Sequence, residues 1–219
     1  GRLAVATSFV RTFAGTSSTD KAAFVDCSDG HVFLCGARPG IRKCSGPGHG
    51  LLEWMEAYAQ RLAEGYYCVA PISNEIPDAV GINLYPFRSA CYAEAVTRTV
   101  RIRASTLFVP ELSNALGEQK FFFSYCMRMK LLEPLGEGIA SCQLVSRHLV
   151  FTKGPAGQAE PEVVDGDGVI GKYPVLQASG SEFSYQSCSW MVSGHGTLTG
   201  SFRVVPGTRA RPLGPAFDV

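Results

Sequence analysis

Hydrophobic and polar residues alternate along most of the second half of the chain. In QKFFFSYCMRMKLLEP (residues 119–134) every second residue from position 121 is large and apolar, and Ser124, Arg128 and Lys130 occupy three of the intervening positions. Alternation of this kind is typical of β-strands with one buried face. The apolar set that it places on one face is Phe121, Phe123, Tyr125, Met127, Met129 and Leu131.

Further alternating segments, separated by turn residues, predict an antiparallel β-sandwich of about 110 residues. In RTVRIR (98–103) the arginines alternate with apolar residues, so we expect Arg101 and Arg103 to lie on a solvent-exposed strand face. Cys126 and Cys142 also fall on predicted strands, where a free cysteine behaves as a small buried hydrophobe.

The first part of the chain contains one segment with helical periodicity, LLEWMEAYAQRLAEG (51–65). Its apolar positions recur at helical spacing and predict a single core-facing stripe, and Gly65 marks the expected end of the helix. The positions of the stripe are Leu51, Met55, Tyr58 and Leu62, with Trp54 widening it.

A β-hairpin is predicted upstream of this helix, in FVDCSDGHVFLCG (24–36), with its turn at Asp29-Gly30. That turn would place Cys27 opposite Val32 and Cys35 opposite Phe24, so the two cysteines would not be directly bridged.

The change of periodicity near residue 92 divides the chain into three parts. We expect a smaller, partial α+β domain over residues 1–91, the β-sandwich over 92–206 and a C-terminal tail over 207–219. The expected fold class is therefore mainly β, with an immunoglobulin- or fibronectin-like sandwich.

Charge and cysteine usage narrow the function classes. The formal net charge is only +1, which argues against a dominant nucleic-acid or anionic-membrane surface. No apolar run is long enough to span a bilayer, and the first residues lack both a signal-peptide core and an initiator methionine. The eight cysteines are scattered without a C-x-x-C pair, so we expect a reducing intracellular compartment, the cytoplasm or nucleus, and no metal or cofactor.

GDGVIGKYP (166–174) has the G-x-G-x-x-G spacing of a dinucleotide-binding loop. Such a loop must open a helix, whose N-terminus supplies the donors for the phosphates. Pro174 and Gly180 leave too few residues for that helix. We therefore expect a loop that crosses between sheets, in which the glycines permit positive φ or close backbone contact. Binding of an anion by consecutive N–H groups in a nest stays open as an alternative.

No catalytic constellation is recognisable in the sequence. His148, on a predicted strand, and His195, in SGHGT, are the strongest candidate bases, but no G-x-S-x-G nucleophile motif accompanies them. Asp165 and Asp167 in VVDGDG lack the glutamate that would complete an EF-hand. We expect a protein that is not an enzyme and that holds no metal.

Four ordered blocks resemble the ApaG domain: SRHLVF, GDGVIGKYPVL, FSYQSC and SGHGTLTGSF. The resemblance covers residues 92–206 and implies an immunoglobulin- or fibronectin-like β-sandwich with a glycine-rich signature. We expect the glycine-rich loop (166–174) and the strand that contains SRHLVF to form a partner- or ligand-binding surface. The residues expected to contribute are Arg147, His148, Gly166, Gly168, Val169, Gly171 and Lys172.

The segment RASTLFVPEL (103–112) and the upstream residues resemble the plant and green-algal F-box proteins, in which a Smi/Knr-like domain precedes ApaG. This resemblance implies a substrate-recognition part of a ubiquitin ligase, with a Skp-type adaptor and a cullin docking through an F-box that these 219 residues do not contain. A structural subunit of a larger assembly, and binding of a small anion or nucleotide at the glycines, are the alternatives.

Overall fold

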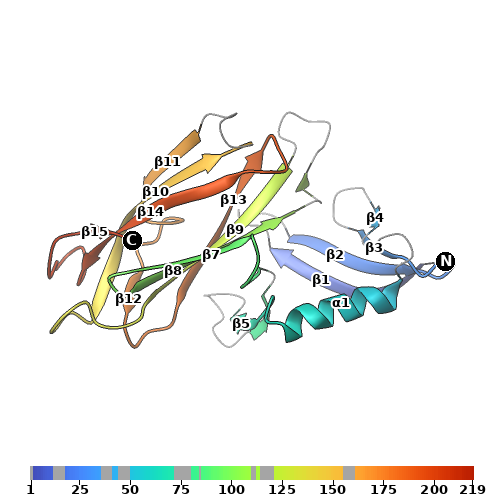
Figure 1. Ribbon diagram of the computed structural model, residues 1–219, viewed down its shortest axis with the longest axis horizontal. Helices are drawn as coiled ribbons and strands as arrows, with labels where there is room; N and C mark the ends of the chain where they lie inside the picture. Colours follow the sequence, from blue (N-terminus) through green and yellow to red (C-terminus); the bar gives the residue numbers. More distant parts are fainter. Residues whose placement is uncertain are drawn as a thin grey trace.

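The computed structural model describes residues 2–11, 18–35, 41–43, 50–71, 80–83, 85–109, 112–113, 121–154 and 161–219. These residues form antiparallel sheets and a single helix, which confirms the mainly β fold class (Figure 1). No helix among them is long and apolar enough to cross a membrane. The division into domains at residues 91/92 and 206/207 stays a prediction.

The first sheet has the strand order β1-β2-β3-β4, with β1 (Arg2–Arg11), β2 (Ser18–Asp26), β3 (Val32–Cys35) and β4 (Ile41–Lys43). The predicted hairpin exists, but its predicted register is wrong. Val25 pairs with Val32, and Cys35 pairs with Ala22. The connection is longer than a two-residue turn because the Asp26 carboxylate accepts hydrogen bonds from the N–H and hydroxyl of Ser28.

The predicted helix is present as α1 (Leu51–Ala63) and ends as expected at Gly65, whose φ is +69°. The N–H groups of Gly65 and Tyr66 donate to the carbonyls of Leu62 and Arg61, which is a Schellman motif. The predicted stripe is wrong at Met55, whose exposed fraction is 54%. Leu51, Trp54, Tyr58 and Leu62 are only half-buried.

After β5 (Val69–Pro71) and β6 (Val80–Ile82), which pair with each other, the chain enters two sheets that pack face to face (Figure 1). One sheet has the order β13-β9-β8-β7, with β7 (Tyr92–Thr97), β8 (Val100–Phe108), β9 (Phe121–Leu131) and β13 (Phe183–Met191). The other has the order β11-β10-β14-β15, with β12 also paired to β10. Its strands are β10 (Ser141–Thr152), β11 (Pro161–Asp167), β12 (Val175–Gln177), β14 (Thr197–Pro206) and β15 (Phe217–Asp218).

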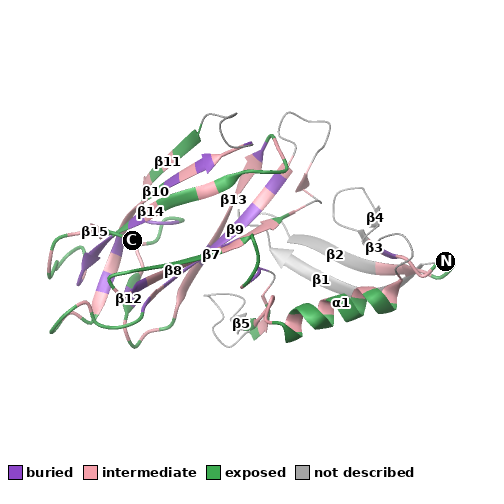
Figure 2. Cartoon of the chain, in the orientation of Figure 1, coloured by how far each residue is buried: buried purple, intermediate pink, exposed green. Residues whose placement is uncertain are grey.

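The core lies between these two sheets, where buried side chains form one cluster; Figure 2 shows the buried residues along their strands. Met129, Leu131, Leu144 and Val204 are almost completely buried there. The predicted apolar face of β9 is therefore confirmed from Tyr125 to Leu131, whereas Phe121 and Phe123 are only half-buried. Cys126 and Cys142 are buried as predicted, and burial raises the pKa of each thiol to about 11.

The opposite face of β9 is not open to solvent, contrary to the alternation-based expectation. Ser124 and Arg128 are buried and contact residues 83 and 85–87, which we call the strap. The Tyr85 hydroxyl lies 2.5 Å from Ser124 Oγ, and the Arg128 guanidinium lies 4.1 Å from the centre of the Phe87 ring. Burial raises the pKa of Tyr85.

The prediction that Arg101 and Arg103 form a solvated face is also wrong. Both side chains are about four-fifths buried and share the carboxylate of Glu182, whose Oε1 lies 2.6 Å from Arg103 Nη2 and 3.4 Å from Arg101 Nη2. The guanidinium of Arg103 additionally faces the ring of Phe87 in the strap. A polar seam of arginines, hydroxyls and one carboxylate therefore joins the strap to the sandwich.

Candidate functional site

The glycine loop, residues 168–174, is an excursion within one sheet and not the crossing between sheets that the sequence led us to expect. The strands on either side of it, β11 and β12, both pair with β10. The loop is fastened to β10 at both ends, because Gly168 N–H donates to Val145 O at 2.8 Å and Leu144 N–H donates to Pro174 O at 3.0 Å. Since the loop leads into β12, no helix follows the glycines.

The tip of the loop is a tight turn. Val169 and Lys172 exchange backbone hydrogen bonds of 2.9 and 2.8 Å, and the two residues between them, Ile170 and Gly171, have φ values of +45° and +74°. Positive φ at both central positions defines a type I′ turn, in which Asn-Gly or Asp-Gly is preferred. The expectation that Gly171 supplies a positive φ is therefore confirmed.

Gly168 is needed for two reasons. Its φ is +57°, and a Cβ atom there would lie 2.4 Å from the carbonyl oxygen of Lys172. Gly166 has a different role, because a Cβ atom at that position would lie 3.0 Å from the Arg147 guanidinium. The predicted uses of these glycines, positive φ and close contact, are both observed.

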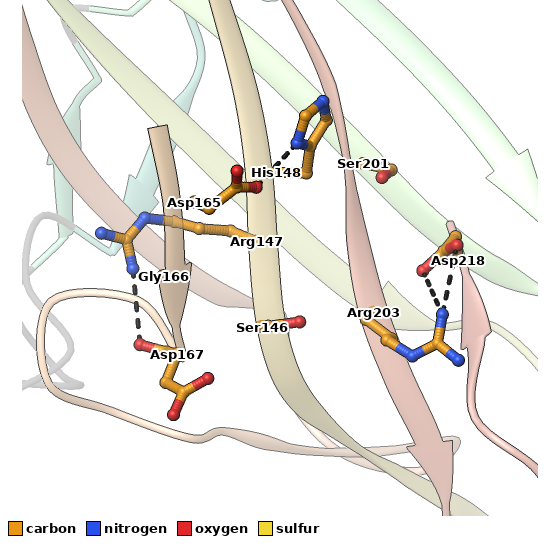
Figure 3. A pocket seen from close by; sticks show the side chains of 9 residues that line it. All are labelled: Ser146, Arg147, His148, Asp165, Gly166, Asp167, Ser201, Arg203 and Asp218. Atoms are coloured by element: carbon orange, nitrogen blue, oxygen red, sulfur yellow. Dashed lines mark hydrogen bonds and ion pairs between the residues drawn. The ribbon is translucent and has the colours of Figure 1, made fainter. Parts of the chain in front are cut away.

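Arg147 braces the loop from the inner side of β10. Its guanidinium lies across Gly166, and Nη1 donates to Gly168 O at 2.7 Å. Nη1 also lies 3.4 Å from Asp167 O, the contact drawn in Figure 3. Burial raises the pKa of Tyr125 and of Tyr185 in the neighbouring core, and the positive charge of Arg147 opposes that shift. The half-buried guanidinium is thus engaged by backbone carbonyls.

His148 lies on the other face of β10, in a row that crosses three strands. Its Nδ1 is 2.7 Å from Asp165 Oδ1 on β11, and its register partner on β14 is Ser201 (Figure 3). Beside this row Arg203 pairs with Asp218 at 3.3 Å. These residues line an open depression of about 710 Å³ on the outer face of the sheet.

The structure separates the predicted site residues into four environments. Val169 is completely buried in the core and Gly168 is also buried, so neither residue offers a partner any surface to contact. Arg147 and Gly166 form the brace, and His148 lies on the outer face. Gly171 and Lys172 are exposed at the tip.

Chemical options at the loop are limited by its internal hydrogen bonds. The N–H groups of Gly168, Val169 and Lys172 all donate to backbone carbonyls, so they do not form an anion nest. His195 is exposed in a turn where its N–H donates to Ser193 Oγ, far along the chain from the His148 row. In the part of the chain that the structure describes, no group of three His, Cys, Asp or Glu side chains could hold a metal ion.

The C-terminal tail holds the loop in place, and no local sequence pattern predicts these contacts. Gln143 on β10 donates from Nε2 to Tyr173 O at 2.8 Å and accepts the Arg209 N–H at 2.8 Å. The guanidinium of Arg209 lies 3.9 Å from the centre of the Tyr173 ring. Asp218, also in the tail, completes the outer face by pairing with Arg203.

Known proteins of the ApaG family are similar to this chain in sequence. The ApaG domain family matches residues 111–206. "F-box protein SKIP16" of Arabidopsis thaliana is 37% identical over 177 residues, which cover 77% of this chain and 38% of that protein. "Protein ApaG" of Anaeromyxobacter dehalogenans (strain 2CP-C) is 36% identical over 124 residues, covering 57% of this chain and 86% of the bacterial protein. A crystal structure of a Bordetella pertussis protein described as ApaA aligns with a TM-score of 0.45 and 26% identity, covering 58% of this chain and 87% of that one.

Proposed function

The chain belongs to the ApaG domain family, and from that premise we propose that it is a protein-recognition module that catalyses no reaction. The observation that carries the proposal is the construction of the glycine loop. The N–H groups of Gly168, Val169 and Lys172 and the Arg147 guanidinium are hydrogen-bonded inside the protein, so the loop offers a partner a fixed backbone shape and exposed side chains. Loops of β-sandwiches commonly carry binding residues because the sheets hold them rigidly.

The outer face of the sheet formed by β10, β11 and β14 also fits partner recognition. The imidazole of His148 has a carboxylate neighbour, but β10, the strand that carries it, is paired on both sides, to β11 and β14, so its N–H groups are used within the sheet and not for a developing oxyanion. A row of Asp, His and Ser side chains without such donors fits recognition better than acyl transfer.

The recognition module would serve as the substrate-binding part of an F-box ubiquitin ligase subunit. The similarity to the plant F-box protein supports this, because its 177 matched residues extend beyond the ApaG range. A Skp-type adaptor and a cullin would then dock through an F-box elsewhere in the full protein. The chain spans 38% of the plant protein, so the ligase role, the adaptor and the substrate are all proposals.

An intracellular, reducing compartment is part of the same proposal. The cysteines that the structure describes are free thiols at positions 27, 68, 91, 126, 142 and 188. Free thiols spread through a folded chain suit the cytoplasm or nucleus, where glutathione keeps thiols reduced.

Copurification from the native cells tests the proposal. The full-length protein is tagged at its own locus, and proteins recovered with it are quantified by mass spectrometry. A Skp-type adaptor and a cullin in the eluate, together with at least one further protein, are the expected result. A stoichiometric complex of other subunits without adaptor or cullin would replace the ligase proposal with a scaffold role, and recovery of the protein alone would contradict partner recognition altogether.

A further inference from the structure

The tip of the glycine loop presents an apolar side chain at a strained backbone position. Ile170 has a φ of +45° and an exposed fraction of 54%. Left-handed backbone is rare for residues other than glycine, and for a β-branched residue it is a genuine outlier. Asn or Gly would occupy the first central position of a type I′ turn with less strain. Strain that the surrounding structure maintains is found preferentially at functional sites.

The surroundings of Ile170 hold it in this conformation. Val169 is buried in the core, Gly168 is hydrogen-bonded to β10, and Tyr173 is fixed by Gln143 and covered by Arg209. A rigid tip loses little conformational entropy when it binds, so an exposed apolar side chain there is a preorganised contact.

Positive charge lies next to this apolar side chain. Lys172 is exposed in the same turn, and Arg209 lies over Tyr173, the residue that follows Lys172. Within the residues that the structure describes, no carboxylate forms an ion pair with Lys172 or Arg209. The nearest carboxylate along the chain, Asp167, faces the depression on the outer sheet face (Figure 3).

We propose that Ile170 and Lys172, with Arg209 beside them, dock onto an acidic protein surface that contains an apolar pocket for Ile170. The pocket would bury the isoleucine, and carboxylates around it would face the lysine and the arginine. This inference rests on the proposed recognition function and adds to it the chemistry of the partner.

Ile170→Asn separates binding from folding, because Asn accepts the left-handed backbone that strains isoleucine. We expect this variant to melt no lower than the wild type, and up to about 2–4 °C higher. Lys172→Glu reverses an exposed charge, and Val192→Asn is the matched control. Val192 is an equally exposed apolar residue (57%) in a different loop.

The assay compares the full-length protein and these three variants by quantitative recovery of copurifying proteins. We expect recovery of one partner to fall at least tenfold for Ile170→Asn and for Lys172→Glu, and to be unchanged for Val192→Asn. In addition, p-benzoylphenylalanine placed at position 170 should crosslink to a segment of that partner rich in Asp or Glu.

Four results would overturn the inference. If partners are recovered equally by the wild type and Ile170→Asn, the docking site is wrong while the proposed function stands. If Ile170→Asn melts several degrees below the wild type, the strain argument is wrong. A crosslink to a second copy of this chain, or to a basic segment, would identify a different occupant. Absence of any partner with the wild type would refute the proposed function and this inference together.

Discussion

Replacing Gly168 by alanine tests whether the loop is shaped as its hydrogen bonds indicate. The substitution introduces a Cβ at a residue with φ +57°, which costs roughly 1–2 kcal/mol for a residue other than glycine. The new atom would also lie 2.4 Å from the Lys172 carbonyl oxygen, a distance at which the backbone must move. That carbonyl accepts the Val169 N–H, and losing this hydrogen bond costs about 1 kcal/mol more. The free energy of unfolding should therefore fall by about 2–3 kcal/mol.

Gly171→Ala is the matched control for that prediction. Its φ is +74°, but no atom lies within 4 Å of the position that a Cβ would take. The expected loss is the conformational part alone, about 1–2 kcal/mol. Urea unfolding of both variants, followed by far-UV circular dichroism, gives the difference directly. Equal losses for the two variants would refute the contact between Gly168 and Lys172, and wild-type stability for both would refute the left-handed turn.

Three further predictions concern the seam and the core. Glu182→Gln removes the carboxylate that two largely buried arginines share, so the free energy of unfolding, measured by urea titration, should fall by about 2–3 kcal/mol. Glu162→Gln is the control: Glu162 forms an exposed ion pair with a lysine, and its replacement should change the free energy of unfolding by less than about 0.5 kcal/mol. Tyr85→Phe should cost about 1 kcal/mol through loss of its buried hydroxyl contact, and an unchanged urea midpoint would show that the strap does not hold the sheet. The thiols of Cys126 and Cys142 have a pKa raised to about 11, so unfolded chains lose these protons first and the melting temperature should fall as pH rises from about 9 to 11. Replacing both cysteines by alanine should flatten that fall, and an identical pH profile would contradict it.

Alternation of side chains predicted β9, β10, β11, β13 and β14 of the sandwich, but not the turn at Arg98 and Thr99 that separates β7 from β8, nor the short strands β12 and β15. The apolar positions of β9 from Tyr125 to Leu131 face the core because a strand in a two-layer fold must bury one face. The same rule failed for Arg128 and Ser124, since it assumes that the second face meets water. The strap that covers them contacts β9 through side chains far away in sequence, and no local pattern contains that information.

The site was predictable in the same limited way. Glycine spacing correctly indicated left-handed backbone at Gly168 and Gly171, because few other residues accept it. It could not show that the loop returns to the same sheet, since that depends on which part of β10 each flanking strand pairs with. Val169 was expected at the binding surface and is buried, and Arg209 was missed because its contact with Tyr173 exists only after the tail folds back.

Transfer of ubiquitin to a copurified partner tests the central claim most directly. The full-length protein, its recovered adaptor and cullin, and the partner are combined with ubiquitin and the activating and conjugating enzymes, and modification of the partner is followed over time. If the chain recognises the substrate of a ligase, the partner should become modified with ubiquitin. The amount of ubiquitin attached should fall at least tenfold with Ile170→Asn and stay unchanged with Val192→Asn. A partner that stays bound in fixed stoichiometry but receives no ubiquitin would contradict the ligase role.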